Sequence, residues 1–127
     1  MDAGWYPNDP RFSSWGWPNT GTWEVDTNRF PHGLRAISDH GRAKGVRTIV
    51  WFEPERVTAG TWLWRSHQDW LLGPKADPNV DVADASKPRE KLLNLGNPQA
   101  REWLTNHVDQ LLTEQGIDLY RQDFNVS

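Results

Sequence analysis

Apolar residues recur with helical spacing in two segments of the chain, and each segment leads through a glycine into an apolar strand. The first predicted helix covers residues 31–44, with Gly45 as its C-terminal stop. Its apolar and small residues fall on one face: Leu34, Ile37 and Gly41. The predicted strand Val46–Phe52 is apolar at nearly every position after Thr48, which is typical of a parallel strand covered on both faces.

The second predicted helix begins at Asn97, a preferred capping residue, with Pro98 at its first position. An apolar stripe with a period of 3.6 residues follows, made of Ala100, Trp103, Leu104, Val108, Leu111 and Leu112. His107 lies on the same stripe, so we expect it to pack at an interface rather than to act as a ligand or base. Gly116 ends this helix, and the last strand begins after it.

The remaining segments complete an alternation of strands and helices. Met1–Trp5 has the pattern of a strand end, and Trp23–Thr27 alternates briefly. The stretch 58–91 is irregular, with a helical turn expected at 62–64 and short strand-like pieces at 69–72, 79–82 and 91–95. About two and a half βα units of a parallel sheet result, and these belong to either an open sheet or a (β/α)₈ barrel. The sequence contains no glycine-rich nucleotide-binding loop, so the barrel is favoured.

Composition narrows the class of partner. The formal net charge is -3 with both signs interspersed, so no basic stripe for nucleic acid is present, and no apolar run is long enough to cross a membrane. Cysteine is absent, which excludes disulfides and thiolate metal sites but leaves the cellular compartment open. The 9 tryptophans suit either a core or the stacking faces of sugar rings, and their excess makes carbohydrate a hypothesis to test.

Polar or aromatic side chains follow each of the three strand ends: Asp2 at the first, Trp51 with Glu53 and Glu55 at the second, and Arg121 with Asp123 at the third. Arg121 and Asp123 are two residues apart, so on a strand they point to the same side. The carboxyl ends of parallel strands gather at the mouth of a barrel, where catalytic groups are found. The pattern therefore predicts a site there.

These residues carry a resemblance to a known family. Trp51-Phe-Glu-Pro-Glu55, Gly116-Ile-Asp with Asp123 and Asn125, and the segments 2–5 and 21–34 resemble glycoside hydrolase family 36, the melibiase-type α-galactosidases. The resemblance implies a retaining glycosidase acting on α-galactosides without cofactor or metal. It also implies that residues 1–127 are a fragment of one catalytic barrel, from the end of the second strand through the fourth, in a parent that forms homo-oligomers.

The resemblance assigns roles to single residues. Asp123 falls on the family's nucleophile in the motif Lys-Trp-Asp-Met-Asn, and Arg121 falls on its lysine, which binds sugar hydroxyls. Asp2 keeps one of two neighbouring substrate-binding carboxylates, whereas Ala3 replaces the other, and this affects sugar specificity. Trp51 matches a tryptophan that packs against the sugar. The general acid/base lies on a later strand in the family, so we expect the isolated chain to be inactive and poorly stable.

Glu53 and Glu55 match the motif, and we expect both to brace the strand end by hydrogen bonds. Several other interpretations stay open. Relatives with a similar site include α-N-acetylgalactosaminidases and galactosyltransferases. A non-catalytic carbohydrate-binding module is the alternative from another class, although such modules are usually antiparallel β-sandwiches without amphipathic helices. A small open α/β domain, with its tryptophans only in the core, is the third.

Overall fold

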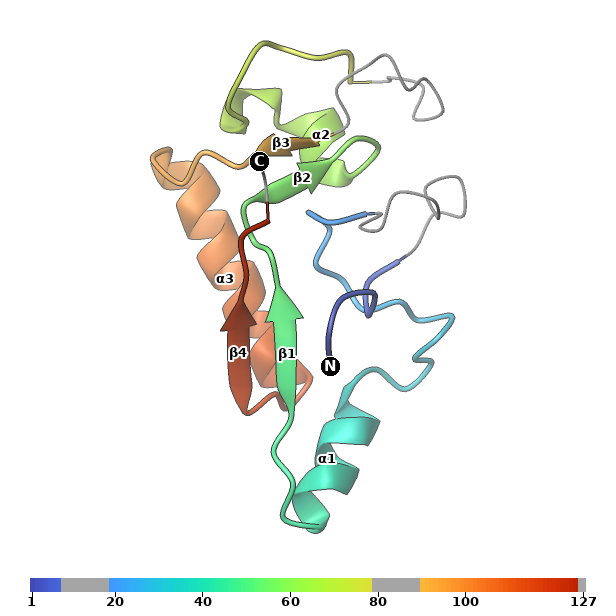
Figure 1. The fold of residues 1–127 in the computed structure, drawn as a ribbon. Coiled ribbons are helices and arrows are strands. Elements are labelled where there is room, and N and C mark those ends of the chain that lie inside the picture. Colours follow the sequence, from blue (N-terminus) through green and yellow to red (C-terminus); the bar gives the residue numbers. More distant parts are fainter. Residues whose placement is uncertain (8–18, 79–89, 126–127) are drawn as a thin grey trace.

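The computed structural model describes residues 1–7, 19–78 and 90–125, which form a mixed α/β arrangement (Figure 1). Its elements, in chain order, are α1 (Arg35–Ala43), β1 (Ile49–Phe52), β2 (Arg56–Thr58), α2 (Trp62–Ser66), the 3₁₀ turn η2 (Gln68–Trp70), β3 (Glu90–Leu92), α3 (Pro98–Glu114) and β4 (Leu119–Gln122). No helix of the described residues is long and apolar enough to cross a membrane.

β1 and β4 are parallel neighbours, paired from Ile49 with Leu119 to Phe52 with Gln122. Figure 1 shows α3 lying along one face of this pair, which is the strand, helix, strand succession expected from the sequence. On the other edge of β1, Met1 donates its amino group to the carbonyl of Ile49 at 2.5 Å, and its carbonyl accepts from the amide of Trp51 at 3.0 Å. Three chain segments therefore lie side by side.

The predicted signals that begin and end α3 are confirmed. Asn97 caps α3, because its side-chain oxygen accepts from the amide of Gln99 at 2.9 Å. Gly116 follows α3 with φ at +62°, and a Cβ there would come within 3.0 Å of the Ser38 hydroxyl. Both the left-handed backbone and the close approach of α1 explain why glycine stands at this position.

The start and the inner face of α1 differ from the prediction. The helix begins at Arg35 rather than Pro31, and the side-chain oxygen of Gln115 accepts from the amide of Leu34 at 2.7 Å, so a distant residue caps it. Ile37 is 45% exposed, whereas Ser38 is fully buried and donates to the carbonyl of Gln115 at 2.7 Å. The prediction for Ile37 was wrong because a hydrogen bond, not hydrophobicity, selects the inner face.

Aromatic side chains fill the core beside β1. Trp5, Tyr6, Trp23, Trp51 and Phe52 are all at most 2% exposed and contact one another ring to ring. Trp5 donates its indole N–H to the carbonyl of Trp51 at 2.9 Å. Several tryptophans are therefore core residues, which is one of the two roles that the excess of tryptophan suggested.

The long excursion after β1 is organised by a small antiparallel pair. β2 pairs with β3 from Arg56 with Leu92 to Thr58 with Glu90, and this pair was not predicted. The helical turn expected at residues 62–64 is confirmed as α2, and the strand-like piece at 91–95 contributes to β3. Residues 69–72 instead form most of η2 and a single bridge, and 23–27 form no strand. The strand-like piece at 79–82 lies outside the described residues.

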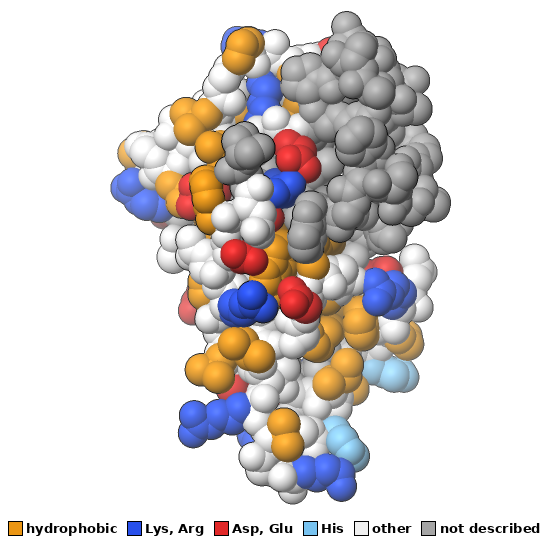
Figure 2. All heavy atoms as spheres, viewed as in Figure 1, with side chains coloured by type: hydrophobic (Ala, Val, Ile, Leu, Met, Phe, Trp, Pro, Cys, Tyr) orange, Lys and Arg blue, Asp and Glu red, His pale blue; other side chains and the backbone are white. Residues whose placement is uncertain are grey.

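The outer edge of the sheet is exposed and only partly apolar. All four residues of β4 are exposed, although the strand is paired to β1 along its other side. Large exposed apolar side chains in β1 and β4 or close to them in the chain are Val46, Ile49, Leu119, Tyr120 and Phe124. Figure 2 shows apolar side chains interspersed with charged ones on this face. An exposed strand edge is a place where a further strand can add.

Candidate active site

The structure brings together all four residues that the sequence predicted for the site. Trp51 on β1 lies in register with Arg121 on β4, and Asp2 follows the segment that pairs with the other edge of β1. Asp123 comes directly after β4, and its amide donates to the carbonyl of Phe52 at 2.8 Å. The site therefore lies at the carboxyl ends of parallel segments, where the alternation of elements placed it.

The Asp123 carboxylate is half-buried and held by hydrogen bonds. One oxygen accepts from the indole N–H of Trp51 at 3.0 Å, and the other accepts from the amide of Phe124 at 3.0 Å. The Trp51 donor is the main cause that lowers the pKa of Asp123, with the Asn125 side chain, the Phe124 amide and the charge of Arg121 acting in the same direction. Asp123 is thus ionised at neutral pH and free of a proton that would block attack.

Arg121 pairs with Asp2 rather than with Asp123. Its guanidinium lies 3.6 Å from a carboxylate oxygen of Asp2, and both side chains are exposed. An exposed pair at this distance contributes little to stability, so both groups remain available to a polar ligand. The charge of Arg121 also lowers the pKa of Asp123, but Trp51 contributes more to this shift than Arg121 does.

Trp51 takes part in the site through its edge. Its side chain is 1% exposed and packs against Trp23, with ring centroids 6.1 Å apart. The indole N–H is the group that reaches the Asp123 carboxylate. In this arrangement Trp51 offers a hydrogen bond to the carboxylate rather than an open face to a ligand.

Glu53 anchors the chain that follows Asp123, which sequence analysis anticipated as a bracing role. Its side chain is fully buried and pairs with Arg56 at 2.9 Å, while one oxygen accepts from the amide of Asn125 at 2.5 Å. Arg56 extends the network to Glu90 at 2.7 Å. Sequence reasoning missed Arg56, although an arginine three residues after a glutamate was a usable signal. Glu55 is half-buried, and its backbone carbonyl accepts from Leu93 at 2.7 Å.

His107 packs as predicted. Its ring stacks on Trp103, with centroids 5.0 Å apart and an interplanar angle of 13°, and its Nε2 lies 2.9 Å from the carbonyl oxygen of Trp23. Among residues 1–7, 19–78 and 90–125, no group of three or more histidine or carboxylate side chains is placed to hold a metal ion.

Replacing Trp51 by phenylalanine is expected to raise the pKa of Asp123, because the indole donor is lost while an aromatic ring remains. The lowered pKa of Asp123 means that its hydrogen bonds stabilise the fold above the ordinary aspartate pKa and lose this effect as pH falls through the folded value. A carboxyl ¹³C NMR titration measures the change. Trp5→Phe is the matched control, since the Trp5 indole donates to a carbonyl and not to Asp123; an unchanged titration in Trp51→Phe contradicts the assignment.

Comparison with known proteins identifies relatives along the whole chain. The family model for melibiase matches residues 1–127. "Alpha-galactosidase 1" from Pediococcus pentosaceus is 29% identical over 126 residues, which cover 98% of this chain and 16% of that protein. The chain thus spans about one sixth of the length of that relative.

Solved structures resemble the chain in the same way. The α-galactosidase from Lactobacillus brevis has a TM-score of 0.69 at 26% identity, covering 94% of this chain and 15% of that one. TtGalA, an α-galactosidase from Thermus thermophilus in complex with stachyose, has a TM-score of 0.70 at 26% identity, covering 97% of this chain and 24% of that one. With a family model that matches from the first residue to the last, this chain belongs to the melibiase family.

Proposed function

We propose that the chain is part of the catalytic (β/α)₈ barrel of a retaining α-glycosidase, and that the substrate is a terminal α-galactoside. The observation that carries the proposal is the ionised Asp123 carboxylate, held by Trp51 at the carboxyl end of β4. Its position and state are those that a carboxylate nucleophile requires.

The extent of the chain supports a fragment of that barrel, from the end of the second strand through the fourth. It corresponds to 16% of a curated relative, and β4 presents an exposed edge to which the next strand can add. An open half-barrel leaves its interior wet and its edges unpaired. We therefore expect residues 1–127 alone to be inactive and poorly stable.

The proposed reaction is a double displacement. Asp123 attacks the anomeric carbon with an electron pair of its carboxylate, the glycosidic bond breaks, and a second carboxylic acid gives its proton to the leaving oxygen. Water then attacks the covalent glycosyl-enzyme, with the second carboxylate removing its proton and Asp123 leaving. The two carboxyl groups of such enzymes are roughly 5–5.5 Å apart. We place the second group outside this chain.

Substrate binding involves the exposed pair beside Asp123. Arg121 donates to sugar hydroxyls through a planar fork, and Asp2 accepts from them. Ala3 stands where the resembling family has a second carboxylate, so this chain has one hydroxyl acceptor fewer next to Asp2. TtGalA was solved with stachyose bound, which supports an α-galactoside as the substrate class.

The proposal is tested with the full-length protein that carries this chain. We expect it to hydrolyse an aryl α-galactoside faster than the matching α-glucoside and N-acetyl-α-galactosaminide, and ¹H NMR should show α-galactose as the first product. First release of the β anomer contradicts a retaining mechanism. Binding of galactosides without turnover supports a carbohydrate-binding module instead, and transfer to an added sugar acceptor in preference to water supports a galactosyltransferase.

A further inference from the structure

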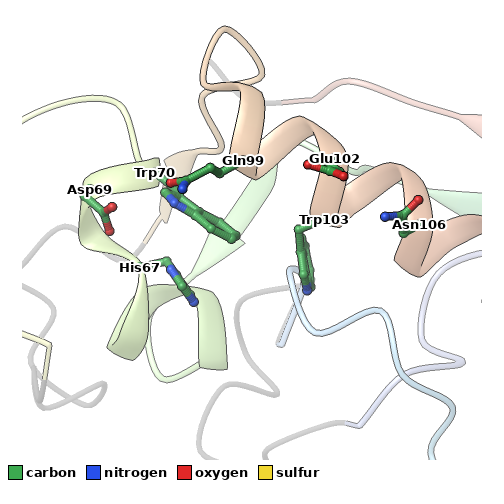
Figure 3. A pocket seen from close by; sticks show the side chains of 7 residues that line it. All are labelled: His67, Asp69, Trp70, Gln99, Glu102, Trp103 and Asn106. Atoms are coloured by element: carbon green, nitrogen blue, oxygen red, sulfur yellow. The ribbon is translucent and has the colours of Figure 1, made fainter.

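A second pocket lies apart from Asp123, between η2 and the N-terminal half of α3 (Figure 3). Its volume is about 440 Å³, within the range of small-molecule sites. Its lining comes from residues 67–70 and 99–106, so none of it belongs to β1, β4 or the segment that carries Asp2. The pocket therefore requires an explanation other than the proposed active site.

Aromatic rings form one side of this pocket. Trp70 and Trp103 have centroids 6.3 Å apart with planes inclined at 48°. His67 stacks on Trp70 at 3.8 Å and itself lines the pocket, and His107 stacks on Trp103 at 5.0 Å, so a second ring fixes each indole. Trp70 is buried and Trp103 is half-buried, so Trp103 offers the more accessible indole. A ring that stacks between two others needs roughly 3.5–4 Å on each side, which is more than the 6.3 Å between these two indole centroids allows. A ligand ring therefore cannot fit between the two indoles and would have to pack on their pocket-facing side.

Polar side chains surround the aromatic rings, as Figure 3 shows. Gln99, Glu102 and Asn106 are spaced so that they share one face of α3, and Asp69 stands opposite them on η2. All four are exposed, and none of their side chains makes a hydrogen bond or ion pair within the described part of the chain. The pocket thus offers two carboxylates and two amides, which both donate and accept.

We propose that this pocket is a second carbohydrate site, which binds a neutral oligosaccharide. The C–H face of a pyranose ring packs on an indole, while its hydroxyl groups donate to carboxylates and exchange hydrogen bonds with amides. The lining contains two carboxylates and no lysine or arginine, which disfavours an anionic sugar. A quaternary ammonium ligand forms no hydrogen bonds and would cover Gln99 and Asn106 without a partner.

Stachyose is the probe, and this choice alone rests on the proposed function. The full-length protein carries Asp123→Ala, which prevents turnover. Titration calorimetry should show that this protein binds one more equivalent of stachyose than the protein that carries both Asp123→Ala and Trp103→Ala. Glu102→Ala combined with Asn106→Ala should remove the same equivalent without disturbing the core, because both side chains are exposed. Asp109→Ala is the matched control on α3, since it is exposed and does not line the pocket, and it should leave the count unchanged.

Two outcomes overturn the inference. One is an unchanged count of equivalents in both the Trp103 variant and the double variant, and the other is displacement of that equivalent by tetramethylammonium. In the background with Asp123 intact, the double variant should hydrolyse an aryl α-galactoside at the parent rate. A parent protein that fails to hydrolyse this substrate counts against the proposed function. The loss of one bound equivalent of stachyose when Glu102 and Asn106 are replaced would still demonstrate the second site.

Discussion

Alanine in place of Asp123 is expected to lower kcat for an aryl α-galactoside by roughly 10⁴-fold or more in the full-length protein. The carboxylate forms the covalent bond in the proposed mechanism, and Asp2, the other carboxylate of the candidate site, is paired with Arg121. Steady-state kinetics measure the loss. A mechanism-based inhibitor should label Asp123 in the parent and leave the variant unmodified.

An added nucleophile separates a chemical role of Asp123 from a structural one. Azide should restore turnover in the Asp123→Ala variant and yield the β-galactosyl azide, because it enters from the face that the carboxylate occupied. Asp118→Asn is the matched control at the opposite end of β4, where the side chain accepts from Thr48 and Arg42. It should retain near-parent kcat. Full activity in Asp123→Ala, or no azide adduct despite a folded protein, contradicts the nucleophile assignment.

Changing Glu53 to glutamine is expected to destabilise the fold by about 3 kcal/mol or more, since it breaks a fully buried ion pair. Arg56 then keeps only Glu90, which is partly exposed, as its charged partner in this network. Thermal or denaturant unfolding of the full-length protein measures the change. The kcat should fall as well, because the Asn125 amide that Glu53 holds fixes the chain just after Asp123.

Glu55→Gln is the control for this prediction, because Glu55 belongs to the same motif but is half-buried. Its expected effect is within about 0.5 kcal/mol of zero, as for most substitutions near the surface. Equal destabilisation by both variants contradicts a special role for the Glu53–Arg56 pair. Unchanged kcat in a destabilised Glu53→Gln protein removes the link to Asp123 but keeps the structural role.

Local signals predicted the helices and the parallel strands well, because each depends on residues close together in the chain. Asn97, Gly45 and Gly116 mark helix ends through their own backbone chemistry. The start of α1 depends instead on Gln115, which is 81 residues from Leu34. The β2–β3 pair escaped prediction because its three-residue strands are too short to show a period, and Arg56 is polar despite being buried.

The sequence predicted that the candidate site residues lie together, but not which contacts they make. Parallel strands end at one edge, so Asp2, Trp51, Arg121 and Asp123 had to lie near one another. Which side chains form hydrogen bonds or ion pairs depends on how far each one reaches across β1 and β4. This cannot be predicted from the sequence. Arg121 and Asp123 are two residues apart and were expected on one side of the strand, yet it is the indole of Trp51 that donates to Asp123, at 3.0 Å.

The use of an indole N–H beside Asp123 has a consequence for ionic strength. Mobile ions screen the attraction between charges, and most strongly where the charges are exposed, as Arg121 and Asp2 are. A hydrogen bond from an uncharged donor with a buried ring is hardly affected by them. The ionisation of Asp123 should therefore stay nearly constant between dilute buffer and concentrated salt, while the Arg121–Asp2 pair weakens. Salt would then act on how tightly the sugar is held more than on the readiness of the carboxylate to attack.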